Sequence, residues 1–304
     1  MASDCAIILC TKNGEKFLQE QLDSLEAQTH HFDLYINDDG SNDQTYKIIK
    51  NFQKRSKYQI HYTRNIYNSA PMNFLKTLKK IERRYDLYFF CDQDDIWEKN
   101  KIEISKMELA SLDQKIPSLF CTSTLIINQM SDVIDSSKIF KKEPCFSNAL
   151  VQSIAGGNTM CFNHQTRDLL DKIINLDSVV SHDWMAYILV SALGGKVIYS
   201  SDSLVKYRKH KKNLIGPNKS IKEMYSRIYQ LFQGRMREWT KKNLLILNEF
   251  KLPNKSQEIL NQFENKAHNG NFFERVNFIV NSNVFRQTYL SNVALHFAIF
   301  LKKI

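Results

Sequence analysis

The chain has 304 residues, enough for one large domain or two smaller ones. Its 43% hydrophobic and 24% charged residues, with a mean hydropathy of −0.40, are typical of a globular protein and exclude a disordered or fibrous chain. It holds only 9 glycines and 5 prolines, which disfavours an all-β sandwich with many tight turns and favours a helix-rich or α/β protein.

Charge is distributed unevenly. Residues 205–304 hold 19 Lys and Arg against 6 Asp and Glu, whereas residues 1–204 hold 23 against 26. A strongly basic C-terminal third indicates an anionic partner there, such as nucleic acid, phospholipid or a pyrophosphate-bearing ligand. The alternative is a solvated helical face that is rich in lysine.

The six cysteines lie far apart and form no C-x-x-C pair, so we expect neither a disulfide scaffold nor a zinc ribbon. Residues 1–4 lack the basic region of a signal peptide, and no stretch approaches the roughly 18 apolar residues that span a bilayer. These features predict a cytoplasmic protein, either free or peripheral on the inner face of the cell membrane.

The first two-thirds of the chain alternates predicted strands with predicted helices. Apolar runs predict strands at 6–9, 34–36, 59–62, 86–91, 119–127, 159–162 and 196–199. Apolar residues at helical spacing predict helices at 15–28, 44–52, 71–81, 99–112, 165–174 and 181–193. This alternation indicates βαβ units, hence an α/β fold with a mostly parallel central sheet flanked by helices.

Strand patterns fade after Pro217, and we expect helices at 221–250, 256–267 and 272–300. A boundary near 214–220 divides the chain into residues 1–216 and a basic helical region, 217–304. Its last stretch is apolar and ends in Lys302-Lys303. Two interpretations of that stretch stay open: a helix in an anionic membrane interface, or a helix packed on the rest of the chain or at a homodimer contact.

Polar clusters follow three of the first four predicted strands, at Thr11-Lys12-Asn13, Asp38-Asp39 and Asp92 to Asp95. Ligands bind outside the carboxyl ends of parallel strands, so we expect these clusters to meet at one edge. Three carboxylates within four residues repel one another unless a cation bridges them, and oxygen ligands suit Mg²⁺ or Mn²⁺. The alternative is an acidic turn in which Asp95 caps the next helix.

Three further features each have a functional and a structural interpretation. Asp38 and Asp39 fit a turn, or a carboxylate that accepts hydrogen bonds from a nucleobase or ribose. Asp183, within His182-Asp183-Trp184, fits a helix N-terminus or a general base at the same sheet edge. His210 is an isolated histidine, a type more often found at the surface than as a ligand.

A resemblance to family 2 glycosyltransferases of the GT-A fold runs from residue 6 to about residue 216. Thr11 to Leu25, with Gln28-Thr29 and Asp38 to Asp43, resembles the opening of that family. Cys91 to Trp97 resembles its D-x-D metal motif, in the D-Q-D-D-x-W form of bacterial rhamnosyltransferase-like members. Three later segments match that branch in order and spacing: Ala155 to Met160, His182 to Trp184, and Tyr207 to Asn213.

The resemblance implies residue roles. The nucleotide pocket would be lined by Thr11, Asn13 and Asp39, with Asp39 at the pyrimidine. Asp92 and Asp94 would hold ribose and a divalent cation, Mn²⁺ or Mg²⁺. Asp183 would deprotonate the acceptor hydroxyl in a single inverting displacement, and Arg208 or His210 would close over the diphosphate or complete the metal shell. Further candidates in the matching motifs are Asp95, Trp97, Gly157, Asn158, His182 and Trp184.

The resemblance thus implies a hexosyltransferase that uses a dTDP- or UDP-sugar to extend a lipid-linked surface glycan, such as capsule, O-antigen or cell-wall polysaccharide. Lys12 departs from the family, where this position is usually tyrosine, so the nucleotide stays open. One alternative is a sugar-nucleotide-binding protein without transferase activity, which the intact Asp residues disfavour. Another is a nucleic-acid-binding protein using the basic third, disfavoured because no known binding module is recognisable.

Overall fold

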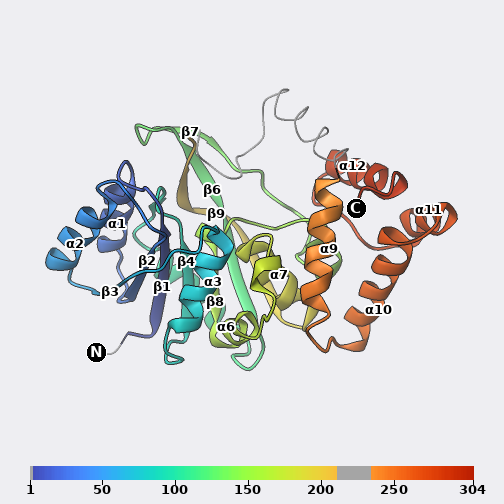
Figure 1. Ribbon diagram of the computed structural model, residues 1–304, viewed down its shortest axis with the longest axis horizontal. Helices are drawn as coiled ribbons and strands as arrows, with labels where there is room; N and C mark the ends of the chain where they lie inside the picture. Colours follow the sequence, from blue (N-terminus) through green and yellow to red (C-terminus); the bar gives the residue numbers. More distant parts are fainter. Residues whose placement is uncertain (1–2, 211–233) are drawn as a thin grey trace.

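The computed structural model describes residues 3–210 and 234–304 (Figure 1). A nine-stranded sheet runs through the middle of the molecule and carries helices on its two faces, and the C-terminal helices lie beyond α7. The boundary predicted near 214–220, the first part of the helix predicted at 221–250, and Asn213 lie outside the described residues.

The strands follow the order β3-β2-β1-β4-β8-β6-β9-β5, and β7 pairs with β6. Strands β1 to β4 form parallel ladders, as do β6 and β9, whereas the antiparallel ladders of β5, β7 and β8 are short. Their bounds are β1 Cys5–Thr11, β2 Asp33–Asp38, β3 Gln59–Arg64, β4 Leu87–Cys91, β5 Ile96–Trp97, β6 Ser118–Ile127, β7 Val133–Ser136, β8 Cys161–Asn163 and β9 Lys196–Arg208. The mostly parallel α/β architecture predicted from the sequence is confirmed.

Each helix predicted within residues 1–204 is present, with its ends moved by a few residues. The helices before residue 200 are α1 Leu18–Glu26, α2 Thr45–Arg55, α3 Ala70–Lys80, α4 Lys101–Ala110, α5 Phe146–Ala149, α6 His164–Asp171 and α7 His182–Ala192, with short 3-10 turns η1 Gly157–Thr159 and η2 Leu176–Ser178. The C-terminal helices are α9 Arg235–Leu247, α10 Asn254–Gln262, the π-helical η3 Phe263–His268, α11 Phe272–Asn281 and α12 Tyr289–Phe300. Among the described residues, no helix is long and apolar enough to cross a membrane.

Strand β1 is apolar throughout because the sheet is covered on both faces. Ile8 packs toward α3 and α7, whereas Ile7 and Leu9 belong to the cluster under α1 and α2. Strand β9 is much longer than predicted, since polar residues in the middle of its sequence conceal the pattern. Its pairing with β6 is irregular around Ser123.

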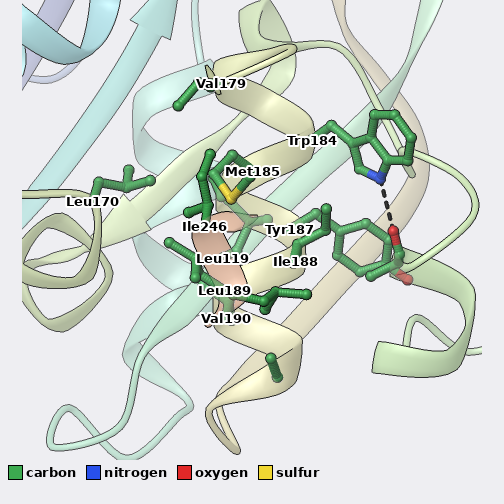
Figure 2. Packing of buried hydrophobic residues seen from close by; sticks show 14 of the residues in the cluster. Leu119, Leu170, Val179, Trp184, Met185, Tyr187, Ile188, Leu189, Val190 and Ile246 are labelled. Carbon is green, nitrogen blue, oxygen red and sulfur yellow. Dashed lines mark hydrogen bonds between the residues drawn. The ribbon is translucent and has the colours of Figure 1, made fainter. Parts of the chain in front are cut away.

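Helix α7 lies in the middle of the larger hydrophobic cluster, and nine of its eleven residues are buried. Figure 2 shows Ile246 of α9 among the side chains of α7, and Trp184 donating from Nε1 to the Ala149 carbonyl at 2.7 Å. The C-terminal helices therefore share a core with the strand-rich part of the chain.

The single helix predicted at 272–300 is wrong, because α11 and α12 are separate. The backbone becomes extended at Ser282, where α11 ends. Helix α12 begins with a capping box, in which the Thr288 and Ser291 side chains each accept a hydrogen bond from the other's backbone N–H. Between them Gln287 donates to the Lys142 carbonyl at 2.9 Å. Val284 is apolar and buried, which hid the break in the hydrophobic pattern.

Ile246 and Leu245 are adjacent in α9 but differ in burial, at 0% and 48% exposed. We expect Ile246→Ala to lower the free energy of unfolding by about 2–4 kcal/mol, because it leaves a cavity in the core shared with α7. Leu245→Ala is the matched control, with an expected change within about 0.5 kcal/mol. Urea denaturation followed by circular dichroism measures both, and equal effects would contradict the shared core.

Candidate active site

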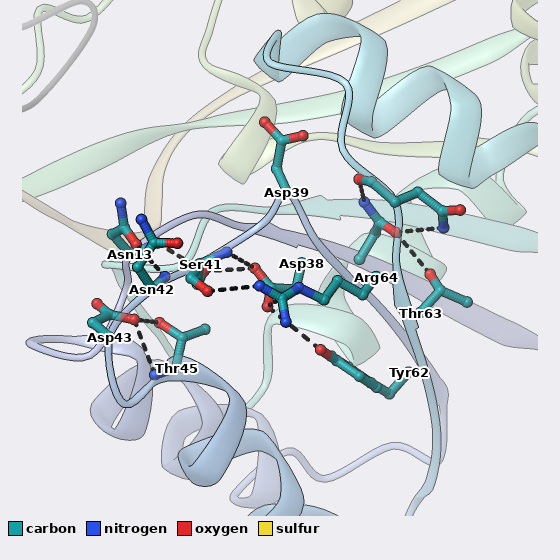
Figure 3. Close-up of polar contacts among 12 residues, drawn as sticks. Asn13, Asp38, Asp39, Ser41, Asn42, Asp43, Thr45, Tyr62, Thr63 and Arg64 are labelled. Carbon is teal, nitrogen blue, oxygen red and sulfur yellow. Dashed lines mark hydrogen bonds and ion pairs between the residues drawn. The ribbon is translucent and has the colours of Figure 1, made fainter.

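The loops after β1 and β2 are tied together by the side chains that follow each strand (Figure 3). Asn13, with a positive φ of 50°, accepts from the Asn42 N–H at 2.9 Å through its side chain. Its own N–H donates to Ser41 Oγ at 2.8 Å, and the Gly14 N–H donates to Thr45 Oγ1 at 2.8 Å. Asn13 therefore holds the shape of the neighbouring loop.

Asp38 and Asp39 have different surroundings. Asp38 is fully buried and accepts from the N–H and hydroxyl of Ser41, at 2.8 and 2.5 Å, so the turn interpretation fits it. Figure 3 shows Asp39 pointing away from that network. One Asp39 oxygen accepts from the N–H groups of Tyr67 and Asn68, leaving Asp39 as the candidate for contact with a base.

Lys12 lies beside Asp39. Its Nζ is 3.4 Å from Asp39 Oδ2 and donates to Asn68 Oδ1 at 2.8 Å. The ammonium group of Lys12 therefore stands where the resemblance leads us to expect tyrosine. It pairs with Asp39, the carboxylate that the resemblance assigns to the nucleobase. Lys12 thus places a positive charge beside Asp39, which an uncharged aromatic side chain would not do.

Gln93, which the sequence analysis missed, joins the end of β4 to the end of β1. Its Oε1 accepts from Thr11 Oγ1 at 2.5 Å and from the Lys12 N–H at 2.9 Å. Thr11 is buried and its hydroxyl is used in this link. The predicted meeting of the polar clusters at one edge is thereby confirmed for these two strands.

Asp94 and His210 are brought together although 116 positions separate them. His210 Nε2 lies 2.7 Å from Asp94 Oδ2, both side chains are mostly buried, and Phe17 stacks on the imidazole at 5.3 Å between ring centroids. A carboxylate oxygen beside an imidazole nitrogen is a donor set that suits Mn²⁺ and also accommodates Mg²⁺ through the carboxylate. These residues therefore fit the cation that the sequence predicts.

The carboxylates around β4 act on one another. Desolvation, and then the charges of Asp95, Asp94 and Asp183, raise the pKa of Asp92 well above its usual range. Desolvation and the charge of Asp94 raise the pKa of Asp95 to about 7, against hydrogen bonds from Asn158 and Arg208 that lower it. A divalent cation would relieve such repulsion.

Asp95 faces the interior and is fully buried. It accepts from Asn158 Nδ2 through one oxygen and from the Arg208 N–H through the other, at 2.5 and 3.0 Å. The interpretation that Asp95 caps the next helix is wrong, because β5 intervenes and α4 begins only at Lys101. Asp95 instead joins the D-Q-D-D segment to β9 and to the Gly157–Thr159 turn.

The Gly157–Thr159 turn connects three parts of the site. The Gly157 N–H donates to Asp183 Oδ2 at 3.0 Å, Asn158 holds Asp95, and the Thr159 carbonyl accepts from Lys101 Nζ at 3.3 Å. A Cβ at Gly157 would lie 2.5 Å from His182 Nε2, so only glycine fits there. The sequence singled out Gly157 and Asn158 but not Lys101, which is buried beneath Trp97.

Asp183 stands at the first turn of α7 with both oxygens oriented. One accepts from the Ser181 hydroxyl and from the Trp184 N–H at 2.6 Å, and the other accepts from Gly157. These donors keep the carboxylate in one orientation. Its negative charge also contributes to the raised pKa of Asp92. The arrangement suits a group that must meet a substrate proton in one orientation.

Three other sequence candidates are core residues. His182 stacks on Phe74 at 4.0 Å between centroids, and burial lowers its pKa to about 4, so the ring is neutral near pH 7. Trp184 packs edge-on against Trp239, and Trp97 packs on Phe89. They shape the surroundings of the candidate site.

The structure places Arg208 behind the acidic segment, within the protein. Its side chain is fully buried, with Nε donating to the Asp94 carbonyl at 2.9 Å and Nη2 paired with Glu20 at 2.8 Å. The same guanidinium donates to Ser131 Oγ at 3.0 Å and lies over the Phe17 ring. Arg208 therefore positions Asp94, and of the two residues named for the diphosphate or the metal shell, only His210 has its side chain against the Asp94 carboxylate.

Comparison with known proteins gives concordant results. The family model described as "Glycosyl transferase family 2" matches residues 6–166. The dTDP-rhamnosyl transferase RfbG of Shigella flexneri is 28% identical over 233 residues, which cover 72% of this chain and 78% of that protein. An uncharacterized glycosyltransferase of Rickettsia typhi is 24% identical over 252 residues, covering 80% and 74%.

Solved GT-A glycosyltransferases have the same fold. The 1–349 portion of TarS from S. aureus, in complex with UDP-GlcNAc, aligns with a TM-score of 0.58 and 16% identity over 99% of this chain and 81% of that one. The mannosyltransferase PcManGT from Pyrobaculum calidifontis, in complex with GDP-Man and Mn²⁺, gives a TM-score of 0.57 and 13% identity over 100% and 87%. The predicted GT-A fold is confirmed.

Because the guanidinium of Arg208 is fully buried, we expect a change at this residue to lower the stability of the fold. Arg208→Lys keeps the charge but loses the planar set of donors, and we expect the free energy of unfolding to fall by about 3 kcal/mol. Lys206→Gln on the same strand is the control; it removes a half-exposed pair with Glu98 and should cost about 1 kcal/mol or less. Chemical denaturation measures both. An Arg208→Lys protein as stable as the wild type would contradict a buried guanidinium whose planar set of donors is needed.

His182 predicts a pH dependence of stability. Its pKa falls from 6.5 unfolded to about 4 folded, so its contribution is full above pH 6.5 and is lost as the pH falls toward 4. Between pH 7 and pH 5 this amounts to about 2 kcal/mol. We expect His182→Leu to lose that part of the slope in denaturation measured at both pH values. The exposed His31→Leu is the control and should keep it; an unchanged slope in His182→Leu would contradict a buried neutral imidazole.

Proposed function

The chain belongs to glycosyl transferase family 2, and we propose that it moves a hexose or deoxyhexose from a nucleoside-diphosphate sugar to a hydroxyl of a growing bacterial surface glycan. The observation that carries the proposal is the closeness of Asp183 to the carboxylates after β4. Two consecutive residues of the Gly157–Thr159 turn hold them: the Gly157 N–H donates to Asp183, and Asn158 Nδ2 donates to Asp95. A group able to accept a proton therefore lies beside the acidic segment whose carboxylates suit ribose and a cation.

The donor would lie across the loops after β1, β2 and β4. Asp39 and Lys12 would meet the base, and Asp92 the ribose. RfbG is a dTDP-rhamnosyl transferase by name, which supports a dTDP-sugar, while the TarS complex with UDP-GlcNAc supports a UDP-sugar. The acceptor would be a glycan or lipid-linked oligosaccharide of capsule, O-antigen or cell-wall type.

Transfer would proceed as one displacement. The acceptor hydroxyl oxygen attacks the anomeric carbon from the side opposite the diphosphate, while Asp183 takes the hydroxyl proton. The bond from the anomeric carbon to the diphosphate oxygen breaks, and the nucleoside diphosphate leaves with the bonding electrons. The product has inverted configuration. Because three donors fix Asp183, little reorientation is needed when the hydroxyl arrives.

Asp94 and His210 would hold the divalent cation, Mn²⁺ or Mg²⁺, with Arg208 supporting Asp94 from behind. When bound, the cation supplies charge neutralisation for the diphosphate leaving group. The solved complex of PcManGT with GDP-Man and Mn²⁺ supports this assignment. Because the side chains of Asp94 and His210 already lie together, little backbone movement would be needed for both to bind one cation.

A sugar-nucleotide hydrolysis screen, with and without Mn²⁺ or Mg²⁺, tests the proposal without a known acceptor. We expect metal-dependent turnover of one donor, reduced about 100-fold or more in Asp94→Asn and in Asp183→Asn. Asp183→Asn should still bind the nucleotide in calorimetry, because Asp183 does not hold the donor. The exposed Asp202→Asn is the control and should match the wild type.

Two outcomes would count against the proposed reaction. Absence of nucleotide binding by the wild-type protein would remove its basis. Donor binding without turnover, both in water and with glycan acceptors, would instead favour a sugar-nucleotide-binding protein without transferase activity.

A further inference from the structure

Helix α12 presents an uncharged, apolar face to solvent. None of its twelve residues is charged. Leu295, Ala298 and Ile299 point inward and are buried, whereas the opposite face exposes large side chains at helical spacing. These exposed side chains are Tyr289, Leu290, Val293, Phe297 and Phe300, between 41% and 82% exposed.

Helix α11 extends this surface. Phe272 contacts Phe300 with ring centroids 5.3 Å apart, and it also contacts Phe273, which is 80% exposed. We call these seven side chains of α11 and α12 the C-terminal apolar face. Figure 1 places both helices at the end of the molecule opposite β3 and α2. Five of the seven are aromatic. Phenylalanine and leucine are typical of the apolar face of an interfacial helix, and the amphipathic ring of Tyr289 suits the headgroup level.

Cations flank the C-terminal apolar face. Lys302 and Lys303 follow α12 after Leu301, and Arg275 donates from Nε to the Phe300 carbonyl at 3.3 Å. Residues 263–304, which hold η3, α11 and α12, include five basic residues and two acidic ones, Glu264 and Glu274. Glu274 is engaged in the capping box at the start of α11. The surface around the apolar face is therefore positive.

We propose that the C-terminal apolar face docks on an anionic lipid bilayer, with α12 lying in the plane of the interface. Apolar and aromatic side chains would enter the boundary of headgroups and acyl chains, while Lys302, Lys303 and Arg275 meet lipid phosphates. A second copy of this chain would bury the same apolar area but bring another five cations with only Glu264 and Glu274 to neutralise them. Charge complementarity therefore favours lipid.

The face is already built before any docking. The buried side of α12 packs against the protein, and Arg237 and His268 bond the chain end at Ile304 with distances of 3.2 and 2.8 Å. A helix held in this way does not need to fold on the membrane, so little ordering entropy opposes binding. The proposal concerns where the protein binds and does not depend on the identity of the donor.

Co-sedimentation of the full chain with lipid vesicles tests the proposal. The vesicles consist of phosphatidylcholine alone, or of equal parts phosphatidylcholine and phosphatidylglycerol. We expect at least about 10-fold tighter binding to the anionic vesicles, and at least about 10-fold weaker binding when Phe273→Ser, Leu290→Ser and Phe297→Ser are combined. The control combines Met107→Ser, Met130→Ser and Ile174→Ser, equally exposed apolar residues elsewhere, and should bind as the wild type does.

A charge variant separates electrostatic attraction to anionic lipid from nonspecific hydrophobic adsorption to vesicles. Lys302→Gln with Lys303→Gln should weaken binding to anionic vesicles by roughly 5-fold per lysine and leave binding to neutral vesicles unchanged. Thermal unfolding and nucleotide binding verify that each variant is folded. Failure of the wild type to bind anionic vesicles would overturn the proposal, as would a dimer in sedimentation velocity that the triple serine variant abolishes while vesicle binding persists.

Discussion

The candidate site depends on one constraint: four carboxylates, Asp92, Asp94, Asp95 and Asp183, must be kept close together despite their mutual repulsion. Desolvation makes that repulsion stronger, because less water is present to screen it. Asp94, Asp95 and Asp183 each have a hydrogen-bond partner that opposes the repulsion. These donors come from the turn at Gly157, from β9 and from the chain just after it, so distant parts of the sequence stabilise one short acidic segment.

The need to hold these carboxylates together explains features of the fold that the residues of each element do not explain by themselves. Strand β9 is long because its end must reach the end of β4, where Arg208 supports Asp94 and His210 pairs with it. Arg208 is buried with Glu20 of α1 as its counter-charge, which lets a cation lie behind the acidic segment without facing solvent. As a result, Asp94 and His210 lie at the carboxyl edge of the sheet and keep some exposure, whereas Asp95 is fully buried.

The sequence predicts seven of the nine strands and the edge at which polar side chains gather, because both follow from local apolar runs and the residues after them; the short strands β5 and β7 have no such run. Only the family resemblance distinguishes Asp39 from Asp38 and Asp94 from Asp95; residue spacing does not, since these neighbours differ in partners contributed from elsewhere, such as Asn158 and Arg208. Burial of Arg208 was unpredictable for the same reason. The break before α12 was missed because apolar spacing continues through Val284.

Helix α7 links the position of Asp183 to the packing of the whole molecule. Asp183 lies at its first turn, and the rest of the helix is the centre of a cluster that includes Ile246 of α9. A close-packed core resists displacement, so the distance between Asp183 and the carboxylates of β4 is fixed by contacts far from either. The C-terminal helices therefore do more than extend the chain: they close the core around the helix that holds the proposed base.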